Sequence, residues 1–508
     1  MKRALISVTD KTGVSDFANK LSKLGYEIVS TGGTLSAIKD SGVKAIAIDE
    51  ITNFPEMLDG RVKTLHPMVH GGLLYRRDLP SHVETAKKYD IKPIDVVAVN
   101  LYDFEGSLKA NKSHEEMIEN IDIGGPSMIR SAAKNHRDVL VVVDPCDYDE
   151  VIERLQNDSA DLDFREKMAM KAYSATAYYD SMIARYFMKK TNQESKTFTI
   201  GLKKVDDLRY GENPHQGAKV YADSFVKSYF SDYKQLNGKE LSYNNLNDLN
   251  SAVELCAEFD SQKGDYAAVA LKHATPCGVA LGTSAFDAYK KTYEADKLSI
   301  FGGIVAMNAQ VCAETAKLMS EIFLEVVAAP GYTQEALEIL KQKKNLRVLV
   351  IDFKAKRAEI DIKYVSGQVL IQETDSIEDA KFECATTANP TSEEERDLKF
   401  AMKVCKYVKS NAVVIAKNTT TVAIGGGQTS RIWALNSAIN NYSDKDFEGC
   451  VMASDAFFPF PDCVEKAAEI GITSIIQPGG AMRDQLSIDE CNKNNISMIF
   501  TGTRHFKH

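Results

Sequence analysis

The chain places a lysine and a histidine side by side at the end of a predicted strand, a pairing that suits acid–base chemistry on an anion. Lys272 and His273 follow the hydrophobic run 266–271, which predicts a buried strand. A histidine there offers a base near neutral pH, and the lysine offers a positive charge for an oxyanion or a phosphate. Pro276 and Gly278 predict that the chain turns directly after this pair. Alone, the pair fits either a site or an ordinary surface turn.

Three clusters in the first third of the chain suit a phosphate-bearing ligand. Thr31–Thr34 joins a strand to a helix, so its backbone N–H groups and the helix dipole can bind an anion, although a plain capped turn fits equally well. Gly60–Pro67 carries two cations and a histidine. Asp122–Ser127 opens a helix that presents Arg130 and Lys134 on one face. Either of the last two clusters alone is explained better as exposed charge, but together with the Thr31–Thr34 turn they favour a small phosphorylated ligand.

Length and composition limit the classes of protein to which the chain can belong. Its 508 residues are too many for one ordinary core, so two or more domains are expected. The 44% hydrophobic and 26% charged residues are typical of a globular protein. A net charge of -9 argues against a broad surface for nucleic acid or for an anionic membrane, but leaves room for a local cationic pocket. Walker and dinucleotide motifs are absent from the sequence, which gives no case for ATP or NAD.

The sequence also indicates where the protein works. No apolar run reaches the roughly 20 residues of a membrane span, and the N-terminal segment lacks the apolar stretch of a signal peptide. The nine cysteines are scattered without C-x-x-C spacing, so neither a disulfide framework nor a zinc ribbon is indicated. A reducing cytoplasm is therefore expected.

Alternating strand and helix signals must position the candidate residues. In the first third, strands are expected near 4–8, 26–30, 43–48, 96–99 and 139–143. With helices between them, they predict a parallel sheet covered on both faces. The polar segment 189–196 reads as a linker. Beyond it, Gly425–Arg431 joins a strand to a helix and is another candidate anion site. Further strands are expected near 266–271, 413–417, 421–424, 451–454 and 474–477, and no internal repeat is evident.

Taken in order, these motifs closely resemble the bifunctional purine-biosynthesis family that joins AICAR transformylase to IMP cyclohydrolase. The resemblance covers essentially the whole chain, and so many ordered matches are far more specific than any one of them. The shared motifs are TGGT at 31–34, GRVKTLHP at 60–67, NLY at 100–102, IDIGG at 121–125, AAKN at 132–135, RYGENPHQ at 209–216, KHATPCG at 272–278, GGGQTSR at 425–431, SDAFFPFPD at 454–462 and QPGG at 477–480.

The resemblance implies an α/β protein of two domains. Residues 1–195 would form a methylglyoxal-synthase-like cyclohydrolase domain with a parallel sheet. Residues 196–508 would form a transformylase domain with a duplicated cytidine-deaminase-like α/β/α fold. No zinc is expected, because the deaminase signature H-x-E and P-C-x-x-C is broken at Thr275 and after Cys277. The family is homodimeric, with transformylase sites built from both subunits, and a monovalent cation such as K+ is a candidate ligand of the second domain.

The resemblance also implies two successive reactions on small-molecule substrates, without nucleic acid or membrane. The C-terminal domain would transfer a formyl group from 10-formyltetrahydrofolate to the 5-amino group of AICAR, giving FAICAR. In this step His273 would accept the proton, Lys272 would support the oxyanion, and Asn411 would position the formyl group. The resemblance implies that Arg431 and Asp462 help to bind the folate. The residues that would hold the nucleotide are Arg209, Tyr210, Asn245, Arg504 and Phe506.

The N-terminal domain would then close FAICAR to IMP with loss of water. Ring closure is intramolecular, so holding the reacting atoms together supplies much of the catalysis. The implied residues for proton movement and oxyanion support are Lys63, Tyr102, Asp122 and Lys134, whose division of roles the sequence does not reveal. The implied phosphate- and ribose-binding residues are Ser7, Lys11, Gly33, Thr34, Arg61 and Thr64.

The chain departs from the family pattern at three places. Asp103 stands where the family commonly has proline, Thr275 where bacterial members often have asparagine, and Ala481–Asp484 where a Ser-Ile pair is usual. The first two flank candidate sites and could alter rates. The rival hypothesis is a non-catalytic or single-activity nucleotide sensor that keeps the phosphate site. A sensor could dispense with the catalytic residues Lys272, His273 and Asn411, and the presence of all three favours an enzyme.

Overall fold

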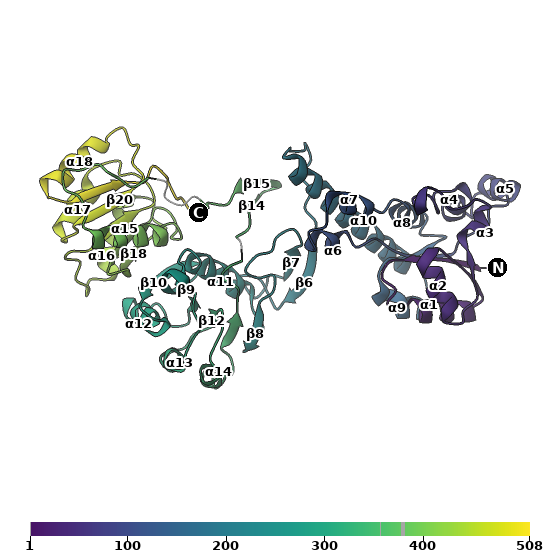
Figure 1. The fold of residues 1–508 in the computed structure, drawn as a ribbon, viewed down its shortest axis with the longest axis horizontal. Helices are drawn as coiled ribbons and strands as arrows, with labels where there is room; N and C mark the ends of the chain where they lie inside the picture. The colour runs from purple at the N-terminus through teal and green to yellow at the C-terminus, as the bar shows by residue number, and fades with distance from the viewer. Residues whose placement is uncertain (1, 356, 377–380) are drawn as a thin grey trace. The chain divides into compact units, whose positions relative to one another are not determined.

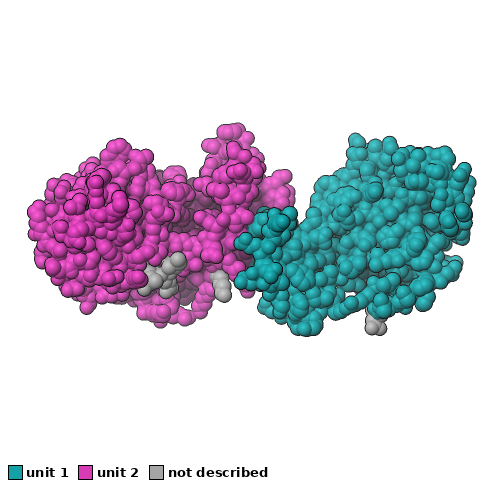
Figure 2. All heavy atoms as spheres, turned by 90° about the horizontal axis from the view of Figure 1, so that it is seen from above, with its two compact units in different colours: residues 1–203, 222–225 teal, residues 204–221, 226–508 magenta. Residues whose placement is uncertain are grey.

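The computed structural model describes residues 2–355, 357–376 and 381–508. The chain forms two compact units, one of residues 1–203 with 222–225 and the other of residues 204–221 with 226–508 (Figure 2). All nine cysteines are free thiols. Among the described residues, no helix has the length and apolar character that crossing a membrane requires.

The first unit is built on a parallel sheet with the strand order β3-β2-β1-β4-β5, and Figure 1 labels the helices of this unit. Its strands are β1 (Lys2–Val8), β2 (Tyr26–Ser30), β3 (Ala45–Ala47), β4 (Val96–Asn100) and β5 (Leu140–Val142). The strand order reverses between β1 and β4, and ligands of such sheets bind at the carboxyl ends of the strands beside this switch point. The predicted parallel sheet is confirmed.

The helices of the first unit follow from apolar periodicity ended by turn residues. Helix α1 buries Val14, Phe17 and Leu21 in the core, and Gly25, with φ +85°, lets the chain enter β2. The helices are α1 (Val14–Lys23), α2 (Gly32–Asp40), α3 (Ile48–Thr52), α4 (Pro67–Leu74), α5 (Pro80–Lys88), α6 (Phe104–Lys109), α7 (His114–Glu119), α8 (Gly124–Lys134), α9 (Tyr148–Gln156) and α10 (Leu162–Thr191). Short 3-10 turns lie at Leu58–Gly60 and Pro145–Asp147.

The second unit contains a twelve-stranded mixed sheet with the order β16-β21-β20-β19-β17-β18-β10-β9-β11-β12-β13-β8. Its strands are β8 (Lys234–Asn237), β9 (Tyr266–Lys272), β10 (Thr275–Gly282), β11 (Ile304–Met307), β12 (Val326–Ala329), β13 (Arg347–Val350), β16 (Glu383–Cys384), β17 (Val413–Lys417), β18 (Thr420–Gly425), β19 (Val451–Ser454), β20 (Ser474–Gln477) and β21 (Ser497–Phe500). Two further hairpins pair β6 (Leu202–Leu208) with β7 (Ala218–Asp223), and β14 (Ile360–Val365) with β15 (Gln368–Glu373).

Within the described part of the second unit, eight helices cover this sheet in two sets. Helices α11 and α15 share one core with the sheet, and the other six pack in two separate cores. The helices are α11 (Tyr243–Cys256), α12 (Ala285–Ala295), α13 (Ala313–Ser320), α14 (Gln334–Lys341), α15 (Ser392–Cys405), α16 (Arg431–Asn441), α17 (Asp462–Glu469) and α18 (Asp484–Lys493). A 3-10 turn lies at Ser261–Lys263.

The order of these elements contains an internal repeat that was not evident in the sequence. The succession α11-β9-β10-α12-β11-α13-β12-α14-β13 recurs as α15-β17-β18-α16-β19-α17-β20-α18-β21. The two halves of the sheet meet where β10 pairs antiparallel with β18, and each half ends in one extra strand, β8 or β16. The duplicated α/β architecture implied by the family resemblance is therefore confirmed.

The turn predicted at Pro276 and Gly278 is wrong. The chain turns before these residues, at His273 and Ala274, which have φ values of +55° and +53°. Pro276 and Gly278 lie inside β10, where the pairing with β9 shifts register. Glycine is needed there for close packing rather than for a turn, because an added Cβ at Gly278 would lie 2.6 Å from the backbone oxygen of Thr292.

Candidate functional site

The first unit has a cavity at the carboxyl ends of β1 and β4, the position that its strand order favours. Its volume is about 760 Å3. The three sequence clusters that suit a phosphate all contribute to its walls. The predicted site residues that line it are Ser7, Lys11, Gly33, Thr34, Arg61, Lys63, Thr64, Tyr102 and Asp122.

The N-terminus of α2 forms one wall of the cavity, and two lysines from other segments lie beside its first residues. The Nζ of Lys63 lies 3.7 Å from the point where a Cβ on Gly32 would stand, and the Cε of Lys11 lies 3.7 Å from the same point on Gly33. The first amides of a helix have no partner within the helix, and its dipole attracts anions. Two ammonium groups above such an end make a strong site for a phosphate.

Hydroxyl groups fix the shape of this wall. Thr34 is buried, and its Oγ1 accepts from the amide of Val8 (3.1 Å) and donates to the carbonyl of Val8 (2.9 Å). Ser7 Oγ and Thr31 Oγ1 lie 2.8 Å apart at the carboxyl ends of β1 and β2. The side chain of Thr34 is thus occupied with β1, so its backbone is the part that can meet a ligand.

Carboxylates pair with two of the cations of the cavity. Lys63 Nζ pairs with Glu56 at 2.8 Å, and Arg61 pairs with Glu119. Both pairs are substantially exposed, so each contributes little stability. A phosphate can exchange with these carboxylates at small cost.

Asp122 lies at the N-terminus of α8 in a desolvated position. Burial raises the pKa of its carboxyl group above the ordinary value, although the nearby backbone N–H groups of Gly125, Tyr102 and Gly124 act in the opposite direction. The amide of Gly125 donates to Asp122 Oδ1 at 2.8 Å, and an added Cβ at Gly125 would collide with the carboxylate. A carboxyl group with a raised pKa can hold or release a proton nearer neutral pH.

The loop that carries Asp122 is held by a buried tyrosine of α10. Tyr179 Oη accepts from the amide of Asp122 and donates to the carbonyl of Asn120, both at 2.8 Å. Sequence reasoning missed Tyr179, because it lies 57 residues from Asp122 inside an ordinary helix pattern. No local signal could have identified it.

The remaining predicted residues of this unit lie in two different places. Tyr102 is exposed at the cavity mouth. Asp103, where the family commonly has proline, caps α6 by accepting from the amide of Gly106 at 2.7 Å. Lys134 is exposed at the last position of α8, about 15 Å along the helix from Gly124, and does not line the cavity. Its catalytic role stays a prediction.

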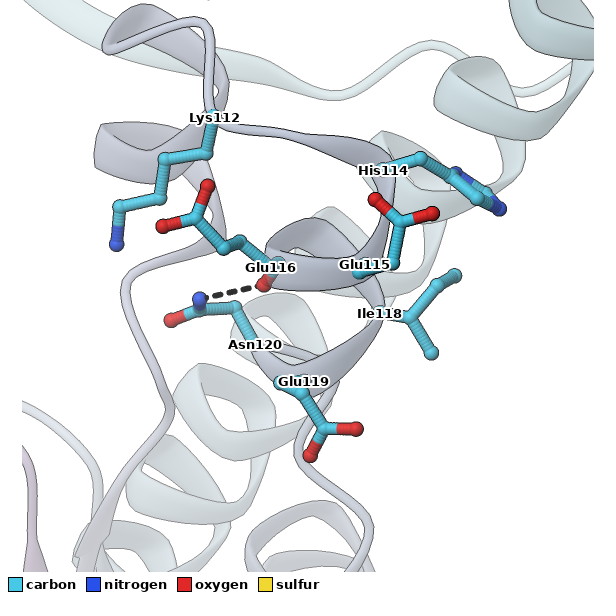
Figure 3. Close-up of a pocket in the computed structure, with 7 residues that line it drawn as sticks. All are labelled: Lys112, His114, Glu115, Glu116, Ile118, Glu119 and Asn120. Atoms are coloured by element: carbon cyan, nitrogen blue, oxygen red, sulfur yellow. Dashed lines mark hydrogen bonds between the residues drawn. The ribbon is translucent and has the colours of Figure 1, made fainter.

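Residues of the short helix α7 and the positions beside it line a second hollow (Figure 3). The side-chain Nδ2 of Asn120 donates to the backbone carbonyl of Glu116 at 2.8 Å. Ile118 and Glu119 also belong to the main cavity. The three carboxylates of this hollow, on Glu115, Glu116 and Glu119, make it unsuited to an anion.

In the second unit, Lys272 and His273 stand at the turn between β9 and β10. His273 is exposed, and Lys272 Nζ donates to the carbonyl of Phe301 at 3.0 Å. The carboxylate of Asp248 on α11 accepts from the amides of His273 (3.1 Å) and Ala274 (2.8 Å). This turn therefore presents an imidazole to solvent from a fixed backbone.

Asn411 precedes β17 and is held at both ends of its amide. Its Oδ1 accepts from Arg431 Nη2 at 2.7 Å, and its Nδ2 donates to the carbonyl of Gln428 at 2.8 Å. Arg431 is buried and also pairs with the fully buried Asp455. Arg431 is thus directed at Asn411 and Asp455, and its predicted contact with folate stays a prediction.

Four of the other predicted residues form two stacked pairs, and the remaining two lie at the starts of helices. Arg209 stacks on Tyr210, with its guanidinium 4.6 Å from the ring centroid, and Arg504 stacks on Phe506 at 4.4 Å. Asn245 is buried in the first turn of α11, where its Nδ2 donates to Glu325 at 3.1 Å. The first residue of α17 is Asp462.

The two groups of catalytic candidates in this unit lie at one edge of the sheet. β9 ends at Lys272, and β17 runs antiparallel to it through β10 and β18, so Asn411 lies at the edge where β9 ends. Three strand spacings separate β9 from β17, about 14 Å.

Comparison with known proteins decides the family. The AICARFT/IMPCHase bienzyme profile matches residues 132–441, and the MGS-like domain profile matches residues 13–127. The chain is 54% identical to the bifunctional purine biosynthesis protein PurH of Clostridioides difficile (strain 630), 50% to that of Oceanobacillus iheyensis and 52% to that of Thermoanaerobacter sp. (strain X514), each over 100% of both chains. The chain belongs to the AICARFT/IMPCHase bienzyme family.

Membership of the AICARFT/IMPCHase bienzyme family confirms the resemblance found in the sequence. It supports both enzyme activities, AICAR transformylase and IMP cyclohydrolase, and the expected α/β fold with an MGS-like first domain. Within the described ranges of this bienzyme chain, no group of three or more His, Cys, Asp or Glu side chains is placed to hold a metal ion.

Proposed function

We propose that this chain carries out the last two steps of IMP formation. It transfers a formyl group from 10-formyltetrahydrofolate to AICAR, and then closes FAICAR to IMP with loss of water. The observation that carries the proposal is the full-length match to bifunctional relatives at 50–54% identity. The cavity with Lys11, Arg61 and Lys63 at its walls supports the ring-closure step, because FAICAR carries a phosphate group.

In formyl transfer, the 5-amino nitrogen of AICAR attacks the formyl carbon of the folate. His273 accepts the proton that this nitrogen loses, and Lys272 stabilises the oxyanion. Asn411 orients the formyl oxygen, because both ends of its amide are fixed. Collapse of the intermediate breaks the bond to N10 of the folate, which takes up a proton and leaves as tetrahydrofolate. We propose substrate-binding roles for Arg209, Tyr210, Asn245, Arg431, Asp462, Arg504 and Phe506.

We propose that the transformylase works as a homodimer whose sites use both subunits. His273 and Asn411 approach the same sheet edge from strands about 14 Å apart, which is farther than two side chains reach directly. This separation supports a site in which a second copy of the chain supplies one of the two groups.

In ring closure, the carboxamide nitrogen of FAICAR attacks its own formyl carbon, and the resulting hydroxyl leaves as water. Lys11, Lys63 and the N-terminus of α2 bind the phosphate, with Ser7, Thr34, Arg61 and Thr64 around it. Asp122 moves a proton, which suits the raised pKa of its carboxyl group. Tyr102 and Lys134 remain further candidates for proton movement and oxyanion support.

We assign cyclohydrolase activity to residues 1–195 and transformylase activity to residues 196–508. We propose the cytoplasm as the place of action, which the nine free thiols support. The cosubstrate is 10-formyltetrahydrofolate, and K+ binding in the second domain stays a prediction.

A paired assay tests the proposal. AICAR and 10-formyltetrahydrofolate are supplied, and tetrahydrofolate and IMP are measured together. Equal amounts are expected from the wild-type protein. His273→Ala should abolish formyl transfer while FAICAR is still closed, and Lys63→Ala should do the reverse. If AICAR binds but neither product forms, the chain is a nucleotide sensor and the proposal is wrong.

A further inference from the structure

We propose that Asp248 is a positioning residue for formyl transfer, whose carboxylate holds the turn that carries His273. This inference rests on the proposed transformylase function of the second unit. Asp248 lies on α11, one layer below the turn between β9 and β10. It reaches that turn through two hydrogen bonds, from the backbone amides of His273 and Ala274.

The turn needs such support because of its backbone conformation. His273 and Ala274 both have positive φ, +55° and +53°, a region that residues other than glycine rarely occupy. Two successive residues at positive φ form the two-residue turn that β-hairpins favour, but residues other than glycine, asparagine and aspartate adopt it at a cost, so contacts that hold the turn stabilise it. The half-buried carboxylate of Asp248 meets both amides at once, at 3.1 and 2.8 Å, and so fixes the direction in which the imidazole leaves the backbone.

The second repeat contains the same arrangement. Asp397 on α15 accepts from the amides of Asn418 (2.7 Å) and Thr419 (2.6 Å), whose φ values are +53° and +51°. The preceding lysine is repeated as well. Lys417 Nζ donates to the carbonyl of Glu448 at 2.7 Å, as Lys272 does to that of Phe301 at 3.0 Å.

The two turns therefore share one frame and differ in the side chain that it presents. In the first repeat that side chain is the imidazole of His273, and in the second it is the amide of Asn418. The second turn has the same aspartate contacts but no histidine, so the aspartate holds the turn whether or not a base is present. Because the base occurs only on the first frame, only Asp248 is coupled to chemistry.

The test compares Asp248→Ala with the matched control Asp397→Ala. Each variant removes one carboxylate from one turn, but only the first turn carries the base. We expect Asp248→Ala to lower kcat for formyl transfer roughly 10- to 100-fold with the KM for AICAR changed less than about 3-fold, since misplaced catalytic groups cost this much. Asp397→Ala should leave kcat within about 3-fold of wild type.

A rescue separates positioning from general damage. Glycine adopts positive φ readily, so adding Ala274→Gly to Asp248→Ala should raise kcat at least about 5-fold above that of Asp248→Ala alone. Thr419→Gly in the same background should restore nothing. FAICAR closure by the first unit, measured on the same samples, reports the concentration of active protein, and the fluorescence of the single tryptophan, Trp433, reports folding of the second unit. If Asp248→Ala does not fold, Asp248→Asn replaces it, because its amide keeps one acceptor.

Each outcome decides the inference. An unchanged kcat in a folded Asp248 variant would overturn it, and so would an equal loss in Asp397→Ala or a rescue by Thr419→Gly. A loss confined to KM would assign Asp248 to substrate binding instead. Wild-type protein that fails to transfer a formyl group would refute the proposed function rather than this inference.

Discussion

Replacing Arg431 by methionine tests whether this buried arginine positions Asn411. Its guanidinium, 5% exposed, donates to the carbonyl of Ala412 (3.2 Å), to Ser454 Oγ (2.8 Å) and to Asn411 Oδ1 (2.7 Å), and pairs with Asp455. Methionine fills similar space without any donor. The variant therefore removes one partner of a buried ion pair and, in the same step, the group that holds the amide oxygen of Asn411.

The structure sets the size of both effects. Asp455 is fully buried, so loss of Arg431 leaves an uncompensated charge, which costs about 3–5 kcal/mol. With an m value of about 3 kcal/mol/M, the urea midpoint should fall by about 1 M or more. The hydrogen bond to Asn411 has a charged donor and is worth about 1.5–3 kcal/mol. Its loss predicts roughly 10- to 100-fold slower formyl transfer.

A second substitution separates stability from positioning. In the double variant Arg431→Met/Asp455→Asn the uncompensated charge is gone, and an asparagine at 455 can still accept from the amide of Ala412. Most of the lost stability should return, while formyl transfer should stay slow because Asn411 still lacks its donor. Urea unfolding followed by Trp433 fluorescence measures the first quantity, and tetrahydrofolate release measures the second.

Two results would refute this reasoning. If the double variant regains wild-type kcat, Arg431 does not position Asn411. If Arg431→Met raises the KM for 10-formyltetrahydrofolate and leaves kcat unchanged, Arg431 binds the folate directly, as the sequence motif predicts.

Three predictions concern the first unit. Tyr179→Phe removes both hydrogen bonds that hold the Asp122 loop, so FAICAR closure should slow at least about 10-fold with formyl transfer unchanged, and equal slowing of both would contradict this. Asp122→Asn should lessen the fall in thermal stability between pH 4 and pH 7. Burial raises the folded-state pKa of Asp122 above 3.8, so the folded state binds more protons than the unfolded state above pH 3.8 and loses stability as pH rises; an unchanged pH profile would refute this. Asp103→Ala should cost about 1 kcal/mol in urea unfolding and leave closure within about 3-fold, and a larger kinetic loss would give Asp103 a part in the chemistry.

The first sheet could be predicted because its strands are short segments rich in apolar residues that alternate with helical patterns. The prediction was least accurate at the edge, where β3 spans only Ala45–Ala47 instead of 43–48. The turn after β9 was misplaced for a physical reason. Proline and glycine usually mark turns, but here the turn has non-glycine residues at positive φ, held by Asp248 from 25 residues away. Local sequence carries no trace of that contact.

The candidate cavity was only partly predictable. The turn Thr31–Thr34, the loop Gly60–Pro67 and the start of α8 together predict a phosphate-bearing ligand, although each alone also fits an ordinary turn or exposed charge. Their convergence on one cavity depends on the strand order of the sheet, which places the ends of β1 and β4 together. Asn100 was not predicted as a site residue, although its Oδ1 accepts from the amides of Thr9 (2.6 Å) and Asp10 (2.9 Å) and so shapes the cavity rim.

The internal repeat explains how the two groups of residues proposed for formyl transfer come to face the same edge of the sheet. Because β10 and β18 join the repeats antiparallel, the turns of the two repeats lie at opposite edges of the sheet. The edge with the His273 turn also holds Asn411 just before β17, and Arg431 at the start of α16, which follows β18. The opposite edge has the same frame but presents Asn418, which cannot serve as a base near neutral pH. The fold thus provides two equivalent edges, and only one of them carries His273, the proposed proton acceptor.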